Sequence, residues 1–97
     1  MRFLWDRQKN EVNLTKRGFD LAFATLVFKG PTVKRTDDRQ DYGEKRVIAL
    51  GIADGIALTV VYTDRAEGGG EVVRRIISTL VSNHRERKAF SEAFKKG

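Results

Sequence analysis

Apolar and β-branched residues gather in the middle of the chain, in short segments separated by polar turns. Four segments have the composition of β-strands, the last of them weakly: residues 46–52, 56–63, 72–78 and 32–36. The Asp54-Gly55 dipeptide between the first two predicts a tight hairpin turn. Residues 47–63 contain one charge, Asp54, but it lies in the middle, where a membrane-spanning helix tolerates charge least. Two strands joined by a turn therefore explain this stretch better than a membrane span.

Two helices are predicted before these strands. Asp6 can cap a helix over residues 7–16, and Gly18 can end it. Asp20 can cap a second helix, whose apolar residues recur at helical spacing until Pro31 stops it.

A third helix is predicted after the last strand. Asn83 can cap it, with Glu86 in the reciprocal position of a capping box. Residues 2–5 are expected to form a short edge strand or an extended entry. Because the connections between the main segments are short, we expect about four strands to pair antiparallel. The predicted fold class is α+β: two N-terminal helices, an antiparallel sheet of about four strands packed on helices through one face, and a C-terminal helix.

Composition narrows the classes of protein that such a fold can represent. The 97 residues fit a single domain, residues 1–97, with one modest core. A formal net charge of +6 favours anionic partners, and the lack of cysteine excludes a disulfide scaffold and thiolate chemistry. The lone His84 has no carboxylate spaced to chelate with it, so we expect no metal site and no cofactor. The first residues lack the apolar core of a secretory signal, and a cytoplasmic location is expected.

The candidate chemistry lies in arginines on the strands. Side chains alternate between the two faces of a strand, so Arg46 shares a face with Ile48, while Arg74 and Arg75 point to opposite faces. Arg65 follows the end of another strand. These residues are either ordinary surface cations or the lining of a concave positive surface that suits a phosphodiester backbone.

Such a surface also suits RNA cleavage. The 2′-OH of RNA can attack the adjacent phosphate, so a protein need only position the backbone, stabilise the anionic transition state and move protons. Arginine and lysine would supply the stabilisation, and Glu44 or Tyr62 the proton transfer. Chemistry of this kind needs no metal ion.

Several motifs occur in the order found in one toxin family: Trp5-Asp6 with Lys9, Asn13, Lys16 and Gly18; Asp41-Tyr42-Gly43-Glu44 with Arg46 and Leu50-Gly51; Val60-Val61-Tyr62-Thr63 with Arg65; Arg75-Ile76-Ile77-Ser78; and Glu86-Arg87. From Trp5 to about Phe90 the chain resembles the BrnT toxins. The resemblance implies a RelE-like fold and a metal-independent endoribonuclease of a type II toxin–antitoxin system, which cleaves RNA and inhibits translation.

The resemblance also implies partners and site residues. A BrnA-like antitoxin would neutralise the toxin, in a heterotetramer built on an antitoxin dimer, and operator DNA would be bound only through that antitoxin. Carried over by position, the expected catalytic residues are Lys16, Glu44, Arg46, Arg65 and Arg75. The expected further RNA contacts are Lys9, Arg17, Arg74 and Arg87.

Among the positions that depart from the family pattern, three bear on catalysis. Arg17 replaces a histidine, Leu80 replaces an arginine, and Phe90 replaces a tyrosine, so that a phenolic proton donor is lost. These changes leave two alternatives to an active toxin. One is a catalytically weakened protein that acts mainly as the antitoxin's partner in a DNA-binding autorepressor complex. The other is a basic domain that binds nucleic acid non-specifically.

Overall fold

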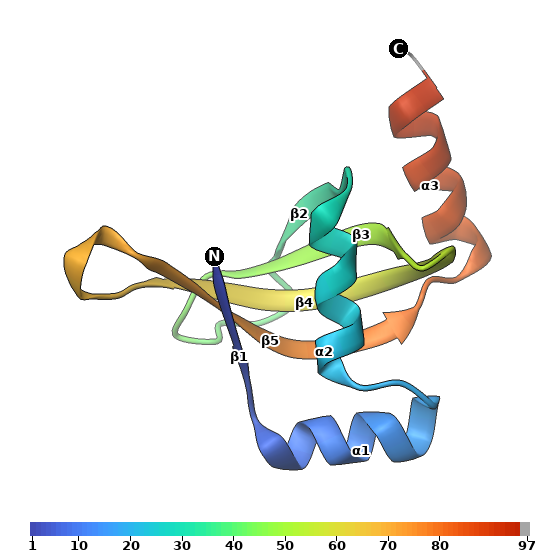
Figure 1. The fold of residues 1–97 in the computed structure, drawn as a ribbon. Coiled ribbons are helices and arrows are strands. Elements are labelled where there is room, and N and C mark those ends of the chain that lie inside the picture. The colour runs from blue at the N-terminus through green and yellow to red at the C-terminus, as the bar shows by residue number, and fades with distance from the viewer. Residues whose placement is uncertain (96–97) are drawn as a thin grey trace.

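The computed structural model describes residues 1–95 of the chain (Figure 1). Along the chain lie strand β1 (Arg2–Trp5), helix α1 (Arg7–Arg17), the short helix α2 (Leu21–Ala24) with the 3₁₀ turn η1 (Thr25–Lys29), strands β2 (Val33–Asp37), β3 (Arg46–Ala53) and β4 (Ile56–Ala66), the 3₁₀ turn η2 (Gly68–Gly70), strand β5 (Val72–Val81) and helix α3 (His84–Lys95).

The sheet differs from the one expected. It has five strands in the order β1-β5-β4-β3-β2, and β1 runs parallel to β5, with Arg2 opposite Val73 and Trp5 opposite Ile76. The protein is α+β, but the prediction of an antiparallel sheet of about four strands behind two leading helices was wrong. The sheet is mixed, and its first strand precedes α1. Strand β1 has four residues, and its partner β5 lies about 70 residues later in the sequence. No local sequence pattern identifies a pairing over that separation.

The local signals for turns and helix starts are confirmed. The Asp6 carboxylate accepts a hydrogen bond from the Lys9 backbone N–H at 3.0 Å, and that of Asp20 does so from Phe23 at 2.9 Å. Asp54 and Gly55 both have positive φ, 48° and 80°, as a two-residue hairpin turn requires. The stretch considered as a membrane span is thus the β3–β4 hairpin, and none of the helices in residues 1–95 is long and apolar enough to cross a bilayer.

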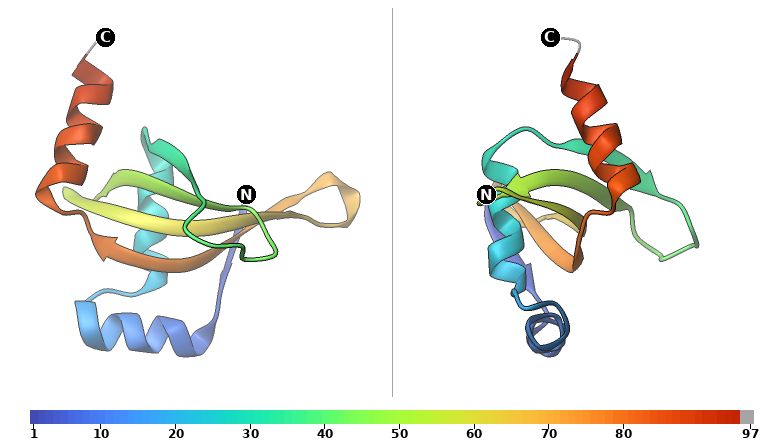
Figure 2. Two further views of the ribbon diagram at one scale, coloured as in Figure 1. Left: turned by 180° about the vertical axis from the view of Figure 1, so that it is seen from behind. Right: turned by 90° about the vertical axis from the view of Figure 1, so that its right-hand side faces the viewer.

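Helix α2 and turn η1 cover one face of the sheet, as Figure 2 shows in its right-hand view. The core on this face joins Leu21, Val27, Leu58, Val60 and Ile76, all at most 1 % exposed. Turn η1 lies so close to β3 that a Cβ on Gly51 would be 2.8 Å from the Val27 Cβ. Glycine is therefore the residue that fits this crossing.

The opposite face carries a smaller apolar cluster of Ile48, Leu50, Val61 and Ile77, against which Phe90 of α3 packs. The start of α3 is fixed by the predicted capping box, in which Asn83 and Glu86 each bond the other's backbone N–H at 2.8–2.9 Å. The rest of α3 projects away from the sheet (Figure 2). No helix covers the other end of this second face (Figure 2), which carries the charged cluster described next and where the Arg75 side chain is 44 % exposed.

Candidate functional site

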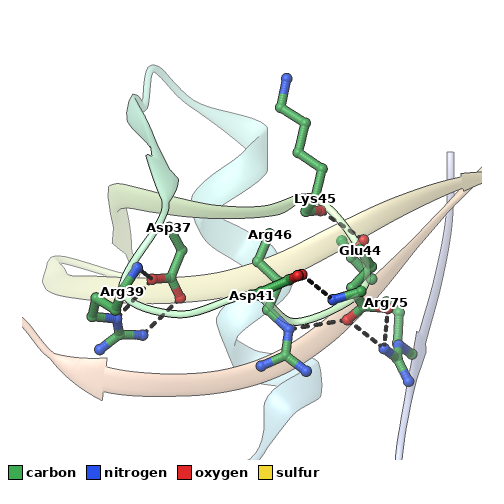
Figure 3. Close-up of polar contacts among 9 residues, drawn as sticks. Asp37, Arg39, Asp41, Glu44, Lys45, Arg46 and Arg75 are labelled. Carbon is green, nitrogen blue, oxygen red and sulfur yellow. Dashed lines mark hydrogen bonds and ion pairs between the residues drawn. The ribbon is translucent and has the colours of Figure 1, made fainter.

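Two strand arginines meet over one carboxylate on the open face of the sheet (Figure 3). Arg46 begins β3 on the side of Ile48, and Arg75 lies on β5 on the side of Ile77. Glu44 belongs to the loop that enters β3. The Glu44–Arg46–Arg75 cluster therefore joins two strands that are separated in the sheet by β4.

The contacts of the Glu44 carboxylate are short. Arg46 Nε donates to Oε2 at 3.0 Å, and Arg75 Nη2 donates to Oε1 at 3.0 Å and to Oε2 at 2.9 Å. The Arg46 hydrogen bond, with smaller help from the charge of Arg75, holds the pKa of Glu44 below its usual range against the opposing effect of burial. Glu44 is therefore an ionised carboxylate at neutral pH and a weak proton acceptor.

The loop between β2 and β3 holds this cluster in place. The Tyr42 ring lies under Arg46, with 4.1 Å from the guanidinium carbon to the ring centroid. Asp37, whose side chain is fully buried, accepts two hydrogen bonds of 2.7 Å from Arg39. That pairing lowers the pKa of Asp37 to about 2. The Asp37–Arg39 ion pair therefore holds the start of the loop, and the Tyr42–Arg46 contact holds the part next to Glu44.

Sequence reasoning overlooked Tyr42 and Asp37 as supports of the site. Tyr42 is part of a motif quoted above, and an aromatic residue four positions before an arginine was the available signal. Asp37 ends the strand that the sequence predicts most weakly. The only sequence signal for its ion pair with Arg39 was that an acidic residue stands two positions before a basic one.

Arg74 lies on the other face of the sheet, as strand alternation predicts. Its side chain is 10 % exposed and bonds both carboxylate oxygens of Asp64, at 2.7 and 2.9 Å. The guanidinium also lies over the rings of Phe28 and Tyr62, at 4.7 and 4.1 Å. This geometry is typical of a structural ion pair, and the expected role of Arg74 in RNA binding stays a prediction.

Tyr62 is 2 % exposed and belongs to the core beneath α2 and η1. Its ring packs against Phe28 and Arg74, on the face opposite the cluster. The structure therefore does not bring Tyr62 together with Glu44, and proton transfer by Tyr62 at the cluster is not supported by its position.

The remaining expected residues lie around the cluster. Lys9, Lys16 and Arg17 of α1 line a groove of about 430 Å³ whose other wall includes Ile77 and Ser78 of β5. Arg65 is exposed near the end of β4, on the Arg75 side of the sheet by alternation. Arg87 stands at the start of α3 and donates to the Ser82 carbonyl at 2.6 Å. The structure thus brings together Glu44, Arg46 and Arg75. Lys16 and Arg65 do not take part in the hydrogen bonds among these three residues.

The cluster can bind an anion. The two arginine side chains are partly exposed, Arg46 at 23 % and Arg75 at 44 %, so N–H groups that do not bond Glu44 are available to a phosphate oxygen. Within residues 1–95, no three His, Asp or Glu side chains gather as a metal site would require.

Comparison with known proteins adds one finding to this geometry. The search of curated proteins gave no match. A family model described as "Ribonuclease toxin, BrnT, of type II toxin-antitoxin system" matches residues 5–86, which is most of the chain and includes the whole Glu44–Arg46–Arg75 cluster. The chain therefore belongs to the BrnT family of ribonuclease toxins of type II toxin–antitoxin systems.

Proposed function

We propose that this chain is an endoribonuclease that cleaves RNA at the Glu44–Arg46–Arg75 cluster without a metal ion, and thereby inhibits translation in the cytoplasm. The observation that carries the proposal is the pair of strand-borne guanidiniums held by one carboxylate on an open sheet face. Family membership supplies the ribonuclease class. The cluster supplies a site at which the charge of a phosphodiester can be stabilised.

In the proposed reaction the 2′-oxygen of RNA attacks the neighbouring phosphorus and loses its proton to water, forming a 2′,3′-cyclic phosphate. The bond from phosphorus to the 5′-oxygen breaks, and that oxygen takes up a proton from water. Negative charge grows on the non-bridging oxygens during this step. Arg46 and Arg75 are held on rigid strands before the charge develops, so they stabilise it with little rearrangement. Lys16 and Arg65 add positive charge around the strand of RNA.

We assign Glu44 to positioning and not to proton abstraction. Its lowered pKa makes it a weak base, while its contacts fix the directions of both guanidiniums. A bound phosphate presents the same kind of oxygen pair as this carboxylate, so it can share or replace Glu44 as the acceptor of the arginine N–H groups.

We further propose that a BrnA-like antitoxin binds over the cluster. A type II family implies an antitoxin partner. A partner segment that is acidic or amphipathic would neutralise the positive charge and cover the exposed apolar residues beside it. The proposed assembly is a heterotetramer through an antitoxin dimer, with operator DNA contacted through the antitoxin.

The test is RNA cleavage by the purified chain in the presence of EDTA, together with growth inhibition on induction. Arg46→Ala and Arg75→Ala should each lower the cleavage rate roughly 10²–10³-fold, by analogy with the loss of one transition-state donor. Glu44→Gln should lower the rate while uncleavable 2′-O-methyl RNA binds as well or better, because a competing negative charge is removed. Arg85→Ala, which removes an exposed arginine from α3, is the control with the same loss of charge.

Several outcomes would decide against parts of this proposal. Variants of Arg46 and Arg75 that remain fully toxic would refute the catalytic assignment. Variants that unfold in thermal melting would make these arginines structural. Cleavage that disappears with EDTA would refute metal independence. A parent protein that captures antitoxin but never cleaves RNA would support the weakened autorepressor partner instead.

A further inference from the structure

The groove between α1 and β5 combines positive charge with an apolar centre. Its volume is about 430 Å³, within the range of small-ligand sites. The helix side contributes Lys9, Val12, Lys16 and Arg17, and the strand side contributes Ile77. A site built from these two kinds of side chain favours a ligand that is apolar in one part and anionic in another.

The charge of the groove is strongly positive. Lys9, Lys16 and Arg17 have no ion pair within residues 1–95. Asp6 also lines the groove, but its carboxylate is engaged by the Lys9 backbone N–H as the cap of α1. Three cations against one capping carboxylate select an anionic ligand.

The apolar centre lies between these cations. Val12 is 48 % exposed although it is a large hydrophobic residue. Lys9, Val12 and Lys16 are spaced three and four residues apart, so they follow one side of α1, with about 10 Å between the turns that carry the two lysines. Every nucleobase has an apolar face, and in a nucleic acid it has a phosphate on either side. The order Lys9, Val12, Lys16 along the helix therefore matches the order phosphate, base, phosphate along a nucleic acid strand.

The groove lies beside the proposed cleavage site, because Ile77 in its wall is close to Arg75 on the same strand. Ile77 follows Arg75 by two residues on β5, so both face the same side of the sheet about 7 Å apart along the strand. A strand of RNA whose phosphate lies on Arg46 and Arg75 would therefore have its neighbouring nucleotide within reach of the groove.

We propose that the groove holds one unpaired nucleobase of the RNA, next to the phosphodiester that is cleaved. The inference rests on the proposed function. The base lies against Val12 and Ile77, and Lys9, Lys16 and Arg17 bind the flanking phosphates. A base in this position cannot be paired, so the substrate is single-stranded RNA. An acidic peptide would match the charge, but the closeness of Ile77 to Arg75 favours the nucleotide.

The experiment measures affinity with fluorescence anisotropy on uncleavable, 2′-O-methyl single-stranded RNA in which one abasic position is moved along the strand. With the parent protein, one position should lower affinity about tenfold, as expected for the loss of one base contact. Val12→Glu should weaken binding of the intact strand and reduce that abasic effect to less than about twofold, because the two changes remove the same contact. Leu14→Glu is the control, since Leu14 is on the same helix, is 51 % exposed and does not line the groove.

If the abasic site lowers affinity equally at all positions, the proposal is overturned. The abasic scan needs only the parent protein, so this outcome does not depend on whether a variant folds. The proposal also fails if Val12→Glu and Leu14→Glu behave alike. If Val12→Glu abolishes capture of an antitoxin but leaves RNA affinity unchanged, the groove belongs to the protein partner. A parent that shows the single abasic position but does not cleave normal RNA would refute the proposed function and leave the nucleobase site standing.

Discussion

At the scale of single residues, the buried carboxylate of Asp37 makes a prediction about acid stability. Pairing with Arg39 lowers the pKa of Asp37 from 3.8 to about 2. A carboxylate whose pKa is lower in the folded state adds stability that is complete above its unfolded pKa and is lost as the pH falls through its folded pKa. We therefore expect the contribution of Asp37 to fade between about pH 4 and pH 2.

The measurement is Tm as a function of pH for the parent and for Asp37→Asn. The variant should melt at a lower temperature at pH 7, and the two curves should converge toward pH 2, where the parent has lost the same ion pair. Asp38→Asn, at an exposed neighbouring position, is the control and should follow the parent. Curves that stay parallel over the whole acid range would show that Asp37 does not carry this linkage.

The sequence predicted which face of the sheet each strand arginine occupies, but not which residue it contacts. Strand alternation correctly separated Arg74 from Arg75, because the period of two is a property of the backbone. Alternation could not identify the partner of either side chain. Asp64 and Glu44 lie on other segments of the chain, and only the folded sheet brings them within hydrogen-bond distance.

At the scale of elements, the crossing of η1 over β3 yields a second prediction. Gly51→Ala places a methyl group 2.8 Å from the Val27 Cβ, an atom that cannot move without the backbone of η1. Such overpacking should lower the free energy of unfolding by about 1–3 kcal/mol. Chemical denaturation gives that value directly.

Val27→Gly offers a check on the mechanism, because it removes the Cβ atom that the new methyl group would meet. Combined with Gly51→Ala it should cost less than the sum of the two single changes. Additive costs would mean that Gly51 is needed for some reason other than this contact.

The elements were predictable where a signal is local. Caps at Asp6, Asp20 and Asn83 and the turn at Asp54 depend on residues within four positions, and all appear in the structure. Strand β1 is different, because its place in the sheet is decided by β5. Pairing over that separation depends on packing of the whole domain, which no short window of sequence contains.

At the scale of the whole molecule, the net charge of +6 predicts a salt-dependent affinity for RNA. For single strands, the logarithm of the binding constant should fall with the logarithm of salt concentration at a slope near −0.7 per phosphate contacted. Lys16→Ala should therefore make the slope less steep by about 0.7 if Lys16 contacts one phosphate.

Lys34→Ala is the matched control for this experiment. Lys34 is exposed on β2 opposite Ala49, on the face away from the cluster, and its loss changes the net charge by the same amount. The control should leave the slope unchanged. Equal changes in both variants would indicate diffuse attraction over the whole surface, which is the behaviour of a non-specific basic domain.

The parallel pairing of β1 with β5 also has a consequence for synthesis. Residues 2–5 leave the ribosome early, but their partners in β5 follow about 70 residues later, and Arg75 is among them. A growing chain therefore lacks both the β1–β5 pairing and Arg75 of the cluster until most of it has been translated. By this topology the proposed site cannot assemble before β5 has been made, and an antitoxin that binds over the cluster can recognise only the finished surface.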